Sequence, residues 1–257
     1  MKKFKRFMSV ALVAVMAVST MAVSMVSTSA ASSNHEYKIT VNTGGSNATS
    51  IDIMSVTVHG TKGSTDSHNI CALAGKNGTN SRTFTDPVDV GEITSIEIEN
   101  IGIDDWYPNY VVVTGPSDTE MIYGGRWISD NKKVTLKDTD NVIQLDIKTS
   151  SDFSSGTDDI VKITLYDYAK HSAVLLDATE IHPAFNAFEK GDDTTLYIYA
   201  PDPDNFGKVD SINISLSSAG ILTPGGDWKV ENITATHVSG NNRGFSKTLM
   251  TDTWIDG

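Results

Sequence analysis

Cysteine is almost absent from this sequence of 257 residues, because Cys71 is the only one. No intramolecular disulfide can form, so burial of apolar side chains has to stabilise the folded state. Basic residues are also scarce: 20 Lys and Arg stand against 32 Asp and Glu, which gives a net charge of −12. A chain of this charge repels the phosphates of nucleic acids, so we expect no nucleic-acid partner.

Long apolar runs are absent except at the start of the sequence. Four basic residues lie between positions 2 and 6, an apolar run extends from Phe7 to about Val26, and small residues lead to Ala31. This order is typical of a secretory signal peptide over residues 1–31, although an uncleaved membrane anchor shares part of the pattern. Its removal takes away four basic and no acidic residues, which leaves 16 basic against 32 acidic residues, or −16. We expect the mature protein to be secreted, extracellular and without a transmembrane span.

The short motifs of the common enzyme classes are missing as well. The sequence contains no Gly-x-Ser-x-Gly, His-Glu-x-x-His, P-loop or Gly-x-Gly-x-x-Gly segment. Its six histidines show no spacing that would clamp zinc. Asp158 and Asp159 are adjacent at the expected start of a strand, so their side chains diverge and cannot work as an acid/base pair. We therefore expect no catalytic residues and a protein that is not an enzyme.

Helical periodicity is absent beyond residue 32, where short runs of alternating apolar and polar residues are separated by Gly, Asn, Asp and Ser. The pattern predicts an all-β protein, with the β-sandwich as its natural architecture. The apolar residues of these runs are Ile39, Val41, Met54, Val56, Val58, Ile93, Ile96, Ile98, Val111, Val113, Leu145, Ile147, Val161, Ile163, Leu165, Leu196, Ile198, Ile212 and Ile214.

The β-rich part of the sequence contains an internal repeat. The segment GEITSIEI at 91–98 matches GKVDSINI at 207–214. Four further pairs keep the same order: Ile39–Thr43 with Leu145–Thr149, Met54–His59 with Val161–Tyr166, Asp105-Trp106 with Asp227-Trp228, and Trp127–Ser129 with Trp254–Asp256. The offset between partners grows from 106 to 127 residues, as expected when insertions accumulate in loops. The repeat predicts two copies of one domain, at 36–130 and 142–257, with Asp130–Lys133 opening a polar linker.

The order of motifs in both copies resembles the PLAT domain, also called LH2. In the second copy a strand ends at Thr149, the loop Gly156-Thr-Asp158 follows, and an alternating strand runs from Val161 to Tyr166. Phe188 before an acidic glycine turn, Asp227-Trp228 and the closing Trp254 complete the resemblance; the segment 227–232 is also similar to the C-terminal domain of clostridial alpha-toxin. The resemblance implies two tandem eight-stranded β-sandwiches, each of two four-stranded sheets, that bind membranes or partner proteins without catalysis.

A loop of the second copy carries candidate ligands for a cation. Calcium prefers carboxylate and carbonyl oxygens, and Asp152, Ser154, Gly156 and Asp158 offer them on one loop. The resemblance adds Asp227 as a remote carboxylate and implies Ca²⁺ as the cation, with one weak site per chain, since the first copy keeps only Asp52 in the matching loop. The alternative is that these residues only shape an Asx-type turn before the strand.

The segment Asp105–Tyr110 offers aromatic side chains near a strand start. We expect Trp106 to pack inside the sandwich and Tyr107, on the opposite face, to be exposed. Exposed Trp and Tyr rings favour the membrane interface.

These patterns predict a secreted, non-catalytic module that binds lipid surfaces peripherally, assisted by calcium because the acidic chain is otherwise repelled by anionic lipid. The alternatives are a protein or glycan adhesion module and an accessory partner of a secreted lipase. A solvent-facing aromatic row on one sheet would favour adhesion. Its candidates are Tyr166, Tyr168, Tyr197 and Tyr199.

Overall fold

The computed structural model describes residues 34–45, 53–71, 78–175, 178, 188–201, 205–218 and 226–257. The predicted signal peptide and the first-copy loop with Asp52 lie outside these residues. Within the described ranges all regular elements are β-strands, as the alternating pattern predicts. No helix in this part of the chain is long and apolar enough to cross a membrane.

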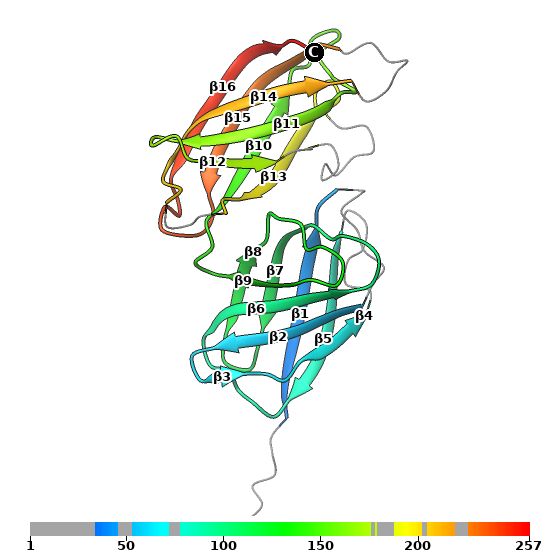
Figure 1. Cartoon of the computed structure of the whole chain (residues 1–257), viewed down its shortest axis with the longest axis vertical. Helices are drawn as coiled ribbons and strands as arrows, with labels where there is room; N and C mark the ends of the chain where they lie inside the picture. Colours follow the sequence, from blue (N-terminus) through cyan, green and yellow to red (C-terminus); the bar gives the residue numbers. More distant parts are fainter. Residues whose placement is uncertain are drawn as a thin grey trace, which may run out of the picture. The chain divides into compact units, whose positions relative to one another are not determined.

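The first copy of the repeat forms a β-sandwich of two antiparallel sheets (Figure 1). One sheet has the order β5-β1-β7-β8, and the other has the order β3-β2-β6-β9, with β4 also paired to β2. The strands are β1 (His35–Thr43), β2 (Ile53–Gly60), β3 (Gly63–Ser64), β4 (His68–Cys71), β5 (Thr79–Asp86), β6 (Ile93–Ile101), β7 (Pro108–Thr114), β8 (Thr119–Tyr123) and β9 (Lys133–Lys137). Because β9 pairs with β6, this sandwich includes residues beyond Asp130, where the repeat comparison ended the first copy.

The second copy forms a sandwich of the same kind, with sheet orders β13-β10-β15-β16 and β12-β11-β14 (Figure 1). Its strands are β10 (Val142–Thr149), β11 (Ile160–Asp167), β12 (Ser172–Leu175), β13 (Asp193–Tyr199), β14 (Val209–Ser217), β15 (Trp228–His237) and β16 (Ser246–Ile255). The prediction of tandem β-sandwiches is therefore confirmed, with seven strands in the described part of the second copy.

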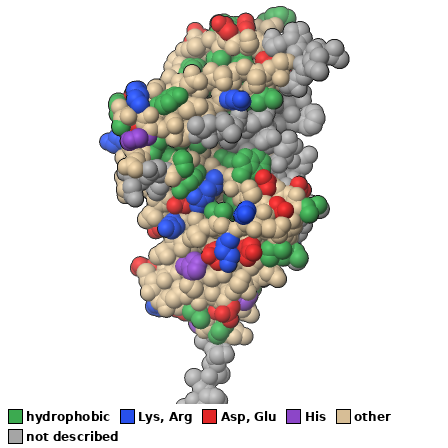
Figure 2. Space-filling model, in the orientation of Figure 1, with side chains coloured by type: hydrophobic (Ala, Val, Ile, Leu, Met, Phe, Trp, Pro, Cys, Tyr) green, Lys and Arg blue, Asp and Glu red, His purple; other side chains and the backbone are tan. Residues whose placement is uncertain are grey.

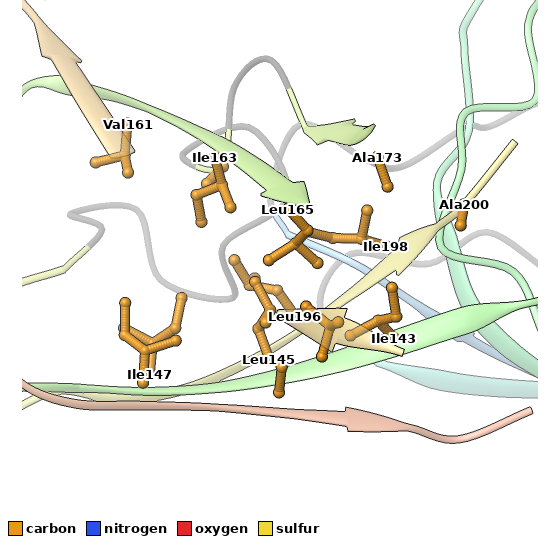
Figure 3. Close-up of a cluster of buried hydrophobic side chains, with 14 of the residues drawn as sticks. Ile143, Leu145, Ile147, Val161, Ile163, Leu165, Ala173, Leu196, Ile198 and Ala200 are labelled. Carbon is orange, nitrogen blue, oxygen red and sulfur yellow. The ribbon is translucent and has the colours of Figure 1, made fainter. Parts of the chain in front are cut away.

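Each sandwich has its own apolar core, built from every second residue of its strands. Figure 3 shows this for the second copy, where side chains from β10, β11 and β13 point toward one another between the sheets. In β10 the core positions are Ile143, Leu145 and Ile147, with exposed fractions of 0–2%. The alternation arises because successive side chains of a strand point to opposite faces of its sheet.

The structure confirms the repeat through one hydrogen bond that occurs in both copies. The Nε1 of Trp106 donates to the hydroxyl of Thr43, and the Nε1 of Trp228 donates to the hydroxyl of Thr149, each over 3.1 Å. All four residues are buried, and both threonines lie at the end of a central strand, next to a register shift. A buried indole N–H requires an acceptor, which explains why Thr and Trp recur together.

Candidate functional site

The loop between β10 and β11, residues 150–159, forms one end of the second sandwich and is held at its base by backbone hydrogen bonds. The N–H of Ser150 donates to the carbonyl of Lys229 over 2.9 Å, and the N–H of Lys229 donates to the carbonyl of Ser155 over 3.0 Å. The buried hydroxyl of Ser155 donates to the carbonyls of Ser150 and Asp152, the latter over 2.9 Å. These bonds fix the start of the loop against β15 and leave its tip to solvent.

Two aromatic side chains are exposed at this end of the sandwich. Phe153, at the loop tip, is 90% exposed, and Trp254, near the end of β16, is 47% exposed. Lys229 connects the two regions: its Nζ lies 2.5 Å from a carboxylate oxygen of Asp152, 3.0 Å from one of Asp252, and 5.9 Å from the centre of the Trp254 ring. An exposed phenyl ring at a loop tip contributes no core packing, so it is available for contact with another surface.

The structure brings three of the five predicted cation ligands together. Ser154, Gly156 and Asp158 line an open hollow of about 180 Å³, which Glu189 also lines. Gly156 lies so close to the following turn that a Cβ there would be 2.8 Å from the backbone nitrogen of Lys190. Glycine is therefore required at this position for close backbone approach.

The other two predicted ligands, Asp152 and Asp227, point elsewhere. The carboxylate of Asp152 is paired with Lys229, whose hydrogen bond and positive charge hold the pKa of Asp152 below its usual range. Asp227 accepts a hydrogen bond from the N–H of Gly257 over 3.3 Å. Among the described residues no group of three or more His, Cys, Asp and Glu converges on a metal position. The five-residue calcium site stays a prediction.

Glu189 is an acidic residue that the sequence analysis did not single out. Burial raises the pKa of its carboxyl group, and the negative charges of Asp158 and Asp192 raise it further. A cation in the hollow would relieve this repulsion. Glu189 lies 31 positions after Asp158 in the sequence, so no local motif could have paired the two.

The prediction for Tyr107 is wrong, whereas that for Trp106 is confirmed. Tyr107 is 1% exposed and Trp106 is fully buried. The Tyr107 hydroxyl donates to the carbonyl of Tyr197 over 2.5 Å, and its ring packs edge-on against Trp127 at 5.2 Å. Tyr107 is thus part of the core cluster of the second sandwich, which covers this face of the strand. A prediction from strand alternation alone does not include a neighbouring domain.

The predicted tyrosine row for adhesion is also absent. Tyr166 lies in β11, and Tyr168, which is 62% exposed, directly follows it. Tyr197 and Tyr199 lie in β13, which belongs to the other sheet. The Tyr197 ring stacks on Tyr123 at 5.7 Å, and the guanidinium of Arg126 covers the Tyr199 ring at 4.0 Å. On the face that Figure 2 shows, acidic and basic side chains are interspersed and the hydrophobic ones form small separate groups.

Comparisons with known proteins agree with this architecture. The model of the PLAT/LH2 domain matches residues 37–138 and again 143–257. No curated protein matches the chain. A crystal structure of a lipoxygenase deletion variant in complex with arachidonate aligns at 23% identity and a TM-score of 0.37, covering 40% of this chain and 16% of the other. A coral 8R-lipoxygenase, described as activated by calcium through a C2-like domain, aligns at 22% identity and a TM-score of 0.36, again covering 40% of this chain and 16% of the other. The chain thus aligns with only a small part of these enzymes.

Proposed function

Because the chain belongs to the PLAT/LH2 domain family and carries the domain twice, we propose that it is a secreted, non-catalytic module that binds lipid surfaces peripherally. The PLAT/LH2 domain is a lipid- and membrane-binding module. The observation that carries the proposal for this chain is Phe153, which is 90% exposed at the tip of the loop before β11. Secretion is supported by the signal-like segment 1–31.

The loop end of the second sandwich has the chemistry of an interfacial anchor. Transfer of a phenylalanine side chain from water into an apolar phase is favourable by about 1.5–3 kcal/mol. Trp254 adds an indole ring, which prefers the boundary between headgroups and acyl chains. In the first sandwich the matching closing tryptophan, Trp127, instead packs against Tyr107 and the core of the second sandwich. The proposal therefore assigns lipid contact to the second copy.

The proposal also includes a calcium ion that binds in the hollow beside the loop tip. The hollow lined by Ser154, Gly156, Asp158 and Glu189 supplies hydroxyl, carbonyl and carboxylate oxygens, which fit this cation. Bound calcium would supply positive charge beside the loop tip and reduce repulsion between the acidic chain and anionic headgroups. We expect a dissociation constant of about 10⁻⁴–10⁻³ M, as in other extracellular modules.

Co-sedimentation with liposomes tests the lipid proposal on the full mature chain. We expect Phe153→Ser to weaken partitioning into phosphatidylcholine and mixed phosphatidylserine vesicles about tenfold or more, from the transfer energy of the ring. Tyr168→Ser is the matched control, because Tyr168 is 62% exposed but follows the far end of β11. Equal binding of all three proteins, or no binding by the unmodified chain, would refute the proposal and favour a protein partner.

Titration calorimetry separates calcium from lipid. We expect heat at millimolar calcium that is lost in Asp158→Asn, together with calcium-dependent binding to anionic vesicles. Asp227→Ala tests the remote carboxylate in the same way. An absence of heat and an unchanged melting temperature at millimolar calcium would remove calcium from the proposal and leave the Phe153 prediction standing.

A further inference from the structure

The outer face of one sheet in the second sandwich carries a second hollow. In β10 the side chains of Ile143, Leu145 and Ile147 point into the core (Figure 3), so the residues between them lie on the outer face of the sheet β13-β10-β15-β16. On that face, residues of β13, β10 and β15 line an open hollow of about 340 Å³, which we call the sheet-face hollow. Its volume is within the range of about 300–1,000 Å³ that is typical of small-molecule sites.

The polar side chains of the sheet-face hollow form two rows that cross the three strands. Each row has a residue of β10 in the middle and residues of β13 and β15 at its sides. The rows are Thr195, Asp146 and Thr234, and Asp193, Lys148 and Asn232. Neighbouring strands are about 4.8 Å apart, and the rows are two residues apart along each strand, so the grid has the dimensions of a sugar ring with its hydroxyl groups.

The carboxylate of Asp146 is held in a fixed position and can still accept a hydrogen bond. The Nε2 of Gln144 donates to both of its oxygens, over 3.0 and 2.9 Å, and the hydroxyl of Thr195 donates to Oδ1 over 2.8 Å. Oδ2 accepts no other hydrogen bond from the described residues. Because each carboxylate oxygen has two acceptor positions, Oδ2 can accept a hydroxyl group of a ligand.

The second row supplies hydrogen-bond donors. The hydroxyl of Thr234 donates to Oδ1 of Asn232 over 3.0 Å, and the NH₂ group of Asn232 has no acceptor among the described residues. The Nζ of Lys148 lies 2.7 Å from a carboxylate oxygen of Glu231 and carries further N–H bonds. The described lining contains two carboxylates and one lysine, so the sheet-face hollow disfavours an anionic ligand.

The matching face of the first sandwich shows that the fold does not require these groups. Asp146 corresponds to Thr40, whose hydroxyl is hydrogen-bonded to that of Ser81 over 2.8 Å, so the two polar groups satisfy each other. Thr234 corresponds to the apolar Val112, since these residues pair with Asp146 and Thr40 in the same register. Asp is depleted in strands. Its presence in the middle of a central strand is a departure of the kind expected at a functional site.

We propose that the sheet-face hollow binds a neutral glycan, with one sugar ring lying across β10. Asp146 accepts a hydrogen bond from a ring hydroxyl, and Asn232 and Lys148 donate to ring oxygens. The threonines offer a methyl group beside each hydroxyl, which suits a ring that presents C–H and O–H groups together. An acyl chain would leave the polar groups unpaired, and a phosphate or sulfate would meet two carboxylates.

An array of neutral oligosaccharides, with oligomers of glucose, mannose, galactose and N-acetylglucosamine, tests the proposal on the full mature chain. We expect saturable binding to at least one of them, with the affinity measured by calorimetry. Asp146→Ala should weaken binding about tenfold or more, because it removes a hydrogen bond to a charged group, and Asn232→Ala should weaken it about fivefold. Thr40→Ala, at the corresponding position of the first sandwich, is the matched control and should bind normally.

Circular dichroism and the melting curve show whether Asp146→Ala is folded; if it is not, Asn232→Ala carries the test. Three results would overturn the proposal. One is an absence of binding to every neutral oligosaccharide of the array. Another is equal binding by the unmodified chain and both variants. The third is preferential binding of sulfated or sialylated glycans. Liposome binding by Asp146→Ala should equal that of the unmodified chain, so the outcome for the glycan is independent of the outcome for lipid contact at Phe153.

Discussion

His237 provides a quantitative test of the second sandwich, because it is a fully buried histidine held in its neutral form. The amide nitrogen of Asn141 donates to the carbonyl of Phe206 over 2.9 Å, so its oxygen faces the ring and accepts from Nδ1 of His237 over 2.9 Å. Nε2 accepts the N–H of Val209 over 3.1 Å. Protonation of Nε2 would place a second donor against the N–H of Val209 and break this hydrogen bond. Burial, and to a smaller extent the positive charge of Lys208, lower the pKa of His237 to about 4.

The magnitude follows from proton linkage. An unfolded histidine titrates near pH 6.5. Below that pH the unfolded state binds more protons than the folded state, so the free energy of unfolding decreases as the pH falls from about 6.5 toward the folded pKa of about 4. Between pH 7 and pH 4.5 we expect the second sandwich to lose about 2 kcal/mol.

The assay is urea unfolding read by hydrogen exchange, which follows peptides of β10 and β1 separately and so distinguishes the two sandwiches. His237→Gln can accept from Val209 and donate to Asn141 without titrating, so this variant should lose most of the acid dependence between pH 6.5 and 4.5. His59→Gln, in the first sandwich, should leave the β10 response unchanged. Identical pH dependence in the unmodified chain and His237→Gln would refute the reasoning.

Two further predictions concern buried polar groups of the same sandwich. Thr149→Val removes the acceptor of the Trp228 indole N–H, so we expect the free energy of unfolding to fall by about 1–3 kcal/mol in a urea titration. A decrease of less than a few tenths of a kcal/mol would contradict a stabilising role of this hydrogen bond. Burial of Asp167 opposes its ionisation most strongly, but hydrogen bonds from the N–H of Gly207 and from His171 outweigh it and lower its pKa. Its ionised form therefore stabilises the fold above about pH 4, and this contribution is lost as the pH falls through the lowered pKa, so Asp167→Asn should have a flatter stability profile in that range.

The sequence predicts strands well where one face is buried, because alternation then repeats over many residues, as in Leu145 and Ile147. The repeat also shows that Thr43 and Thr149, and Trp106 and Trp228, occupy equivalent positions, but the hydrogen bond that joins Thr to Trp in each copy is seen only in the structure. Contacts between distant residues are not predicted in this way. Lys229 neutralises Asp152 from 77 positions away, and Tyr107 is buried by a second domain, so neither contact leaves a local pattern.

The sequence shows that Phe153 is an aromatic residue between Asp152 and Ser154, in a segment with the composition of a loop. Its exposure nevertheless depends on how the loop is held against β15, and composition does not show that. The chemistry of Asp152, Ser154 and Asp158 indicates candidate cation ligands, but it does not show that Lys229 pairs with Asp152.

The placement of β1 and β10 in the middle of their sheets has a consequence for folding kinetics. Val41 of β1 pairs with Asn80 on one side and with Val111 on the other, and β10 is arranged in the same way between β13 and β15. The first strand of each copy is therefore synthesised well before the strands with which it pairs. Such non-local pairing gives a high contact order and slow folding, so each copy stays open until most of it has been synthesised.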